Sequence, residues 1–89
     1  MTREELDRAS ELLESAAADA SGEAADRLQS LADQLSTLSS RDKGPDHGRL
    51  ARIENALDEL VESADADVAA TIEEAHEQIT AYRSGVEGV

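Results

Sequence analysis

The sequence has no cysteine, no phenylalanine and no tryptophan, and it holds a single proline, a single lysine and a single aromatic residue, Tyr82. Without cysteine, the chain has no disulfide, no thiolate metal site and no cysteine nucleophile. Without large aromatic side chains, its core must be built from aliphatic residues. Sixteen of the 89 residues are alanine, so a large part of that core consists of small side chains.

Positive charge is also scarce. Twenty-one Asp and Glu face eight Lys and Arg, which gives a formal net charge of −13, and Lys43 is the one lysine. Carboxylates on so small a body repel one another at ~0.1 M salt, where the Debye length is about 10 Å, but hardly at ~1 M, where it is about 3 Å. Excluded salts also strengthen apolar burial. We therefore expect a halophilic protein. The negative charge and the lack of stacking aromatics argue against nucleic-acid binding.

Long apolar runs are missing as well. No stretch approaches the roughly 20 apolar residues of a membrane span, and the first residues, MTREE, lead into no apolar segment. We expect a soluble cytoplasmic protein with no membrane partner.

Apolar residues recur at steps of three and four in four segments, which is the pattern of a helical face. The four stripes are Leu6, Ala9, Leu13, Ala16 and Ala20; Leu28, Leu31, Leu35 and Leu38; Leu50, Ile53, Leu57, Leu60 and Ala64; and Val68, Ile72, Ala75, Ile79, Tyr82 and Val86. The pattern predicts an all-α fold.

The first helical boundaries follow from capping residues. Thr2 with Glu5 three positions later is a capping box, so the first helix is expected from about residue 3 to residue 19. Ser21 precedes the expected start of the second helix.

Later boundaries carry similar signals. Pro45 or Asp46 marks the start of the third helix, the fourth follows Asp65 or Asp67, and Gly85 is a plausible stop. The chain is thus expected to be one domain, residues 1–89, made of a hairpin over 2–39, a connection over 40–45 and a hairpin over 46–84.

Two internal similarities suggest a duplicated hairpin. ELLESAAAD at Glu11–Asp19 and ELVESADAD at Glu59–Asp67 share seven of nine residues at an offset of 48, whereas the second apolar arms correspond at an offset of 44. The change of offset predicts a loop four residues shorter in the second hairpin.

Equal helices with short links pack antiparallel, which predicts a four-helix bundle, either within one chain or with helices shared in a homodimer. Because the core is thin for a domain of this length, we favour the homodimer. The positions expected to be buried are Leu31, Leu35, Leu38, Ile53, Leu57, Leu60, Ile72, Ile79 and Tyr82.

The segment from Ser39 to Arg52 departs from the acidic pattern, and its cationic and imidazole side chains are Arg41, Lys43, His47, Arg49 and Arg52. Together with free backbone donors at the start of a helix, such groups resemble an anion-binding corner. The alternative, which we favour, is that Asp42 and Asp46 already pair with these cations. No phosphate-binding glycine loop is present.

His76 lies beside the fourth stripe, with Glu73 and Thr80 within one turn. We interpret it as a solvated flank residue rather than a metal ligand, because a metal site needs three or four converging ligands. No serine has a base that the sequence positions beside it, so we expect no enzyme and no cofactor.

The chain resembles the short, acidic, helical proteins of halophilic archaea that form a family of unknown function. The resemblance extends from TREELDRASELL through GPDHGRLARIENAL to ITAYRSGVEG, and GPDHGRLARIE is its specific part. It implies a halophilic, cytoplasmic helical protein and supplies no catalytic residues.

The leading hypothesis is a small protein-protein interaction, scaffolding or regulatory module that uses an apolar helix face or the Gly44–Arg52 corner. The alternative is a binder of a small anion or nucleotide at the Arg41–Arg52 corner.

Overall fold

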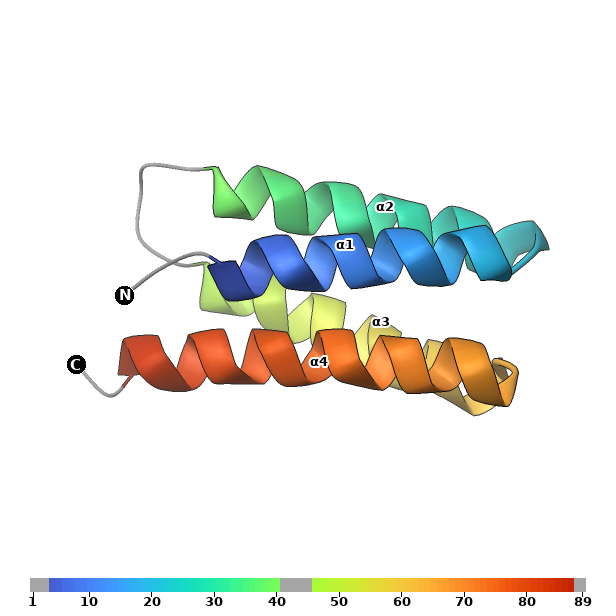
Figure 1. The fold of residues 1–89 in the computed structure, drawn as a ribbon. Helices are drawn as coiled ribbons and strands as arrows, with labels where there is room; N and C mark the ends of the chain where they lie inside the picture. The colour runs from blue at the N-terminus through green and yellow to red at the C-terminus, as the bar shows by residue number, and fades with distance from the viewer. Residues whose placement is uncertain (1–3, 41–45, 88–89) are drawn as a thin grey trace.

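The computed structural model describes the backbone of residues 4–40 and 46–87 and the side chains of 4–40 and 46–84. These residues form four helices, α1 (Glu4–Asp19), α2 (Gly22–Ser39), α3 (His47–Ser63) and α4 (Ala66–Glu87), and no strand. Successive helices run antiparallel in a bundle of 38 × 19 × 19 Å, and the start of α1 and the end of α4 lie at the same end of it (Figure 1). The predicted all-α fold of two hairpins in a four-helix bundle is confirmed.

Helix starts follow the expected local chemistry at α3 and α4. The Asp46 side chain caps α3 by accepting a hydrogen bond from the Arg49 backbone N–H at 3.0 Å, and α4 begins directly after Asp65. Thr2 lies outside the described residues. Gly22 begins α2 with a φ of 61°, a left-handed conformation that glycine adopts without a steric cost.

The predicted stop at Gly85 is wrong, because α4 continues to Glu87. A glycine ends a helix when its backbone turns left-handed; otherwise the helix continues through it at a cost of about 1 kcal/mol.

The predicted difference in loop length is also wrong. Both turns span two residues, since α1 and α3 end at Asp19 and Ser63 while α2 and α4 begin at Gly22 and Ala66. These boundaries are related by one constant offset of 44. Residues of ELLESAAAD and ELVESADAD that match in sequence at an offset of 48 therefore occupy structural positions that differ by about one helical turn.

The core contains every position expected to be buried. Eighteen aliphatic and aromatic residues are at most 8% exposed, and they belong to all four helices. Among the large aliphatic side chains that the structure describes, Leu12 and Val61 are the ones left half-buried.

The surface area of the chain is 5217 Å², close to the value of about 5,000 Å² expected for a compact 9.5-kDa monomer. One chain thus buries its own apolar stripes, which removes the thin-core premise of the expected homodimer. The homodimer itself stays a prediction.

Polar side chains tie α1 to α2. The Ser10 hydroxyl, itself buried, donates to the Ala32 carbonyl at 2.8 Å, and the Ser39 hydroxyl donates to the Asp7 carboxylate. The first hairpin is therefore fixed by hydrogen bonds as well as by apolar packing.

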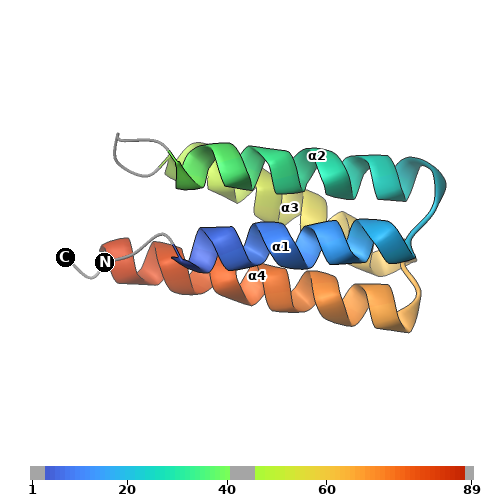
Figure 2. The ribbon, with the colours of Figure 1, turned by 45° about the horizontal axis from the view of Figure 1, so that its top comes forward.

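α1 lies between α2 and α4 and packs against both (Figure 2).

Candidate functional site

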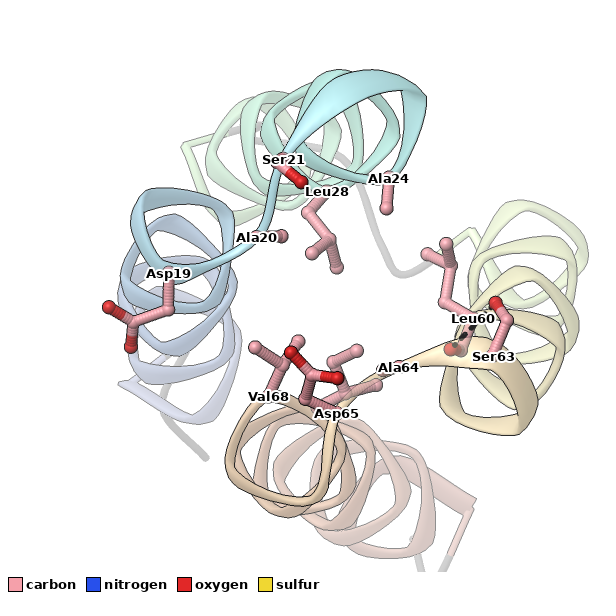
Figure 3. Close-up of a pocket in the computed structure, with 11 residues that line it drawn as sticks. Asp19, Ala20, Ser21, Ala24, Leu28, Leu60, Ser63, Ala64, Asp65 and Val68 are labelled. Atoms are coloured by element: carbon pink, nitrogen blue, oxygen red, sulfur yellow. Dashed lines mark hydrogen bonds between the residues drawn. The ribbon is translucent and has the colours of Figure 1, made fainter.

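The four helices do not pack equally closely. α1 packs extensively against α2 and α4, and α3 packs against α4, whereas α2 and α3 are the pair of neighbouring helices that approach each other least. Seen along the bundle axis, α2 and α3 stand apart on the far side from the α1–α4 contact (Figure 3). We call this α2–α3 boundary the seam.

Residual exposure marks the seam as the less sealed boundary. The buried apolar residues of α1 are at most 1% exposed, but Leu38 keeps 8%, Leu60 keeps 5% and Val68 keeps 6%. These three side chains line two hollows that lie along the seam. Water therefore reaches the edge of the core between α2 and α3.

The constant offset of 44 explains the difference. It relates the α1–α4 boundary to the α2–α3 boundary, so an exact repeat would make the two alike. At three pairs of equivalent positions, however, the side chains differ in size. The buried Ala9 and Ala16 of α1 correspond to Ile53 and Leu60 of α3. The buried Ala75 of α4 corresponds to Leu31 of α2. Since the distance between packed helices depends on the side chains between them, alanine lets α1 and α4 approach while leucine and isoleucine hold α2 and α3 apart.

One hollow, which we call the cup, opens at the hairpin-turn end of the seam. Its volume is about 230 Å³, and its apolar lining includes Leu28, Leu60, Val68 and Ile72. In Figure 3 the side chains of Leu28 and Leu60 point into this space from opposite helices, and the Ser21 hydroxyl and the Asp65 carboxylate point toward it from the turns. The cup thus combines an apolar interior with an acidic, hydrogen-bonding rim.

A second hollow of about 320 Å³ lies at the other end of the seam, between α2 and the first turn of α3. It is lined by Ser30, Asp33, Gln34, Thr37, Leu38 and Arg49. Between the two hollows, Arg27 of α2 and Glu59 of α3 form an ion pair across the seam at 3.6 Å. Both side chains are about half exposed or more, at 49% and 70%, so the pair contributes at most about 0.5 kcal/mol.

Of the residues predicted for an anion corner, the structure describes His47, Arg49 and Arg52, which do not all face the same neighbouring helix. Arg49 faces the seam and also pairs with Asp46 at 3.8 Å. Arg52 is exposed, and it shares a face of α3 with Arg49 and Glu59, which lie three and seven residues away. His47 instead contacts α4, while Arg41 and Lys43 lie outside the described residues. Asp46 thus pairs with one of these cations, as the alternative reading expects.

His47 belongs to a polar network between α3 and α4 that the sequence did not suggest. Arg83 donates from Nε to the His47 Nδ1 at 3.2 Å and from Nη1 to Glu54. The other Glu54 oxygen, Oε2, lies 3.1 Å from the Nε2 of His76 and accepts from the Thr80 hydroxyl at 3.2 Å. Glu54, only 14% exposed, is the centre of this network.

His76 is not the solvated residue that we expected. Its side chain is 29% exposed, and its Nδ1 lies 3.4 Å from the Asp58 carboxylate. The carboxylates beside it come from α3 rather than from Glu73 of its own helix. No group of three His, Cys, Asp or Glu residues in the described ranges has a geometry suited to a metal ion.

The comparison with protein families covers nearly the whole chain, since residues 1–85 match the model of one family of unknown function. The chain belongs to DUF7553, a family of unknown function. No curated protein matches the chain, and no solved structure matches it. Membership of DUF7553 supplies no activity, so we infer the function of this family member from the seam and the polar network.

Among the described residues, no helix of this DUF7553 protein is long and apolar enough to cross a membrane.

The sequence contains a pattern that predicts the seam, but this pattern is not visible when the two hairpins are aligned at an offset of 48 residues. Aligned at 44, the Ala9–Ile53 and Ala16–Leu60 pairs identify which helices approach closely. The polar network was harder to predict from the sequence. The spacing of Glu54 and Asp58 in α3, and of His76 and Arg83 in α4, is ordinary for a helix surface. These residues form a network only because α3 and α4 lie side by side.

Proposed function

We propose that this DUF7553 protein is a non-catalytic interaction module that binds a helical segment of a protein partner along the seam. The observation that carries this proposal is the cup, a hollow with an aliphatic floor and a polar rim that is open to solvent at the end of the bundle, where the neighbouring helices α2 and α3 pack least closely (Figure 3). Peptide helices bind grooves of this kind by placing apolar side chains, spaced by three, four and seven residues, into pockets.

The size and lining of the hollows support a protein partner over a polar substrate. The two hollows, of about 230 and 320 Å³, each suit one or two side chains and are smaller than or at the lower limit of the ~300–1,000 Å³ typical of small-molecule sites. The floor of the cup is aliphatic, and its polar groups stand at the rim. Such a lining favours an apolar anchor over the converging polar groups that catalysis needs.

Each well-buried aliphatic anchor contributes roughly 1.5–3 kcal/mol before the costs of association are subtracted. One anchor in each hollow contributes about 3–6 kcal/mol before these costs, so we expect weak binding, with a Kd on the order of 1 mM or higher for an isolated peptide. A larger partner would add contacts beyond the seam.

The test is a titration of the methyl-labelled protein with a neutral amphipathic 18-residue peptide of leucine and glutamine, followed by NMR at 2 M KCl. We expect shifts at the methyl groups of Leu28, Leu38, Leu60 and Val68 and none at Leu6 or Leu13 of α1. The Ala24→Leu variant, which places a leucine in the cup, should lose the response at Leu60 and Val68. Ala70→Leu, at an exposed position of α4, should keep it.

Shifts confined to other helices, or unchanged by Ala24→Leu, would place binding elsewhere and overturn the proposal. The anion-binding alternative stays a prediction. It is tested by adding phosphate to the same sample, because it requires shifts at the backbone amides of His47 and Arg49 that the Arg49→Ala variant abolishes.

We further propose that the protein works in the cytoplasm at molar salt. The net charge of −13 and the single lysine support this, because the repulsion among its carboxylates is weak only where the Debye length is a few ångströms.

A further inference from the structure

The two ends of the seam differ in charge. Asp19 and Asp65 line the cup at the hairpin-turn end, and no cationic side chain is among its lining residues. Arg49 and Arg52 lie at the opposite end, where α3 begins, and Asp33 and Asp46 lie there with them. A ligand that lies along the seam therefore meets carboxylates without arginines at one end and arginines mixed with carboxylates at the other.

A helix has the matching polarity built into its backbone. Its N-terminus carries about half a positive charge and its C-terminus about half a negative charge. Such a helix is best placed with its N-terminus at the cup and its C-terminus beside Arg49 and Arg52. This direction is parallel to α2, which begins at the cup, and antiparallel to α3, which begins at the arginines.

We propose that the seam binds one amphipathic helix of a partner protein in this single direction, with basic residues in its first turn and acidic residues in its last. The inference rests on the proposed function and adds to it the polarity and charge of the partner. α2 has 18 residues, about 27 Å at 1.5 Å per residue, so a partner helix of about this length spans both hollows.

The charges at the seam are available to a partner. The ion pair of Arg49 with Asp46 is long, at 3.8 Å, and the two side chains are 49% and 38% exposed. Among the described residues, no ion pair involves Arg52. Asp65 lies in the turn before α4, and its side chain is directed toward the cup (Figure 3).

A second copy of this chain is a poorer occupant than a separate partner. Two copies bring together two bodies of charge −13, and the apolar stripes of each copy are already buried by its own four helices. The seam offers pockets for a few anchors, whereas a stable dimer needs an extensive self-complementary patch.

The experiment compares two 18-residue peptides of identical composition, acetylated and amidated so that their termini carry no charge. Both carry leucines at the same positions. One has lysines in its first turn and glutamates in its last, and the other has the reverse order. Fluorescence anisotropy with the full chain at 0.15 M and 2 M KCl gives the two affinities, and a nitroxide at the peptide N-terminus reports direction by broadening nearby methyl signals.

We expect the lysine-first peptide to bind about tenfold more tightly at 0.15 M KCl, since each matched end contributes a small favourable term. Its N-terminal nitroxide should broaden Leu60 and Val68 and spare Leu38. Charge reversal at both ends, with Asp19→Lys, Asp65→Lys, Arg49→Glu and Arg52→Glu, should make the glutamate-first peptide the tighter ligand. Circular dichroism of that variant confirms that it is folded.

Equal affinities, or broadening at both ends of the seam, would overturn the directional inference and leave seam binding intact. If the two charged peptides and the neutral peptide all fail to shift the seam methyl groups, the proposed function is overturned as well. Self-association that sedimentation detects and Ala24→Leu abolishes would replace the partner helix by a second copy.

Discussion

The same substitution, alanine to leucine, is expected to have opposite effects at two positions of this bundle. Ala16 of α1 is fully buried at 0% exposure, whereas Ala24 of α2 is half-buried and lines the cup. Leucine adds three carbons at either site. At Ala24 these carbons enter a hollow of about 230 Å³, and at Ala16 they meet packed side chains.

The magnitudes follow from burial. Three newly buried carbons contribute up to about 2.4 kcal/mol at ~0.8 kcal/mol each, and incomplete burial and lost rotamer freedom reduce this to about 1 kcal/mol of stabilisation for Ala24→Leu. Overpacking at Ala16 costs about 1–3 kcal/mol. The two variants should thus differ by about 2–4 kcal/mol in the free energy of unfolding. Helix propensity changes equally in both and cancels.

Urea denaturation followed by circular dichroism at 2 M KCl measures the difference. With a denaturant slope of about 1 kcal/mol per molar urea, the two midpoints should lie about 2–4 M apart. Ala70→Leu, at an exposed position, should stay within about 0.5 kcal/mol of the parent protein. Equal destabilisation at Ala16 and Ala24 would contradict this prediction, because it would mean that the cup has no room for a larger side chain.

Three further outcomes are expected. Glu54→Gln removes the carboxylate that His76 and Arg83 share. Because these groups are partly buried, the substitution should lower the free energy of unfolding by about 1–2 kcal/mol. An unchanged free energy of unfolding in urea denaturation would show that the network is unimportant for stability. Ser10→Ala removes the buried hydrogen bond to the Ala32 carbonyl and should cost about 0.5–1 kcal/mol by the same assay, less than the bond alone because alanine favours the helix. Raising KCl from 0.1 to 2 M should increase the unfolding free energy of the parent protein, and a flat salt dependence would contradict the halophilic interpretation.

The helices and the core could be predicted from the sequence because both depend on local periodicity. A residue such as Leu35 or Ile79 is buried wherever its stripe packs, so the stripe alone identifies it. Helix starts at Asp46 and after Asp65 were equally local, since capping involves neighbouring residues.

The candidate site was less predictable because it depends on which helices are neighbours. His47 and Arg49 are close in sequence, yet the rotation of 100° per residue in a helix directs His47 to α4 and Arg49 toward α2. The partners of His76 come from α3, twenty-two residues away in the case of Glu54. No local pattern carries that information.

A partner helix seated in the seam is expected to move α2 and α3 apart and to leave the α1–α4 boundary closed. Because the chain has no cysteine, spin labels can be attached at introduced cysteines without interference. We would measure electron-electron distances for Gln29→Cys with Asn55→Cys across the seam and for Glu14→Cys with Glu74→Cys across α1 and α4, all exposed positions. With the lysine-first peptide added, we expect a longer distance across the seam and an unchanged distance across α1 and α4. A seam distance that the bound peptide leaves unchanged, or a change confined to α1 and α4, would contradict it.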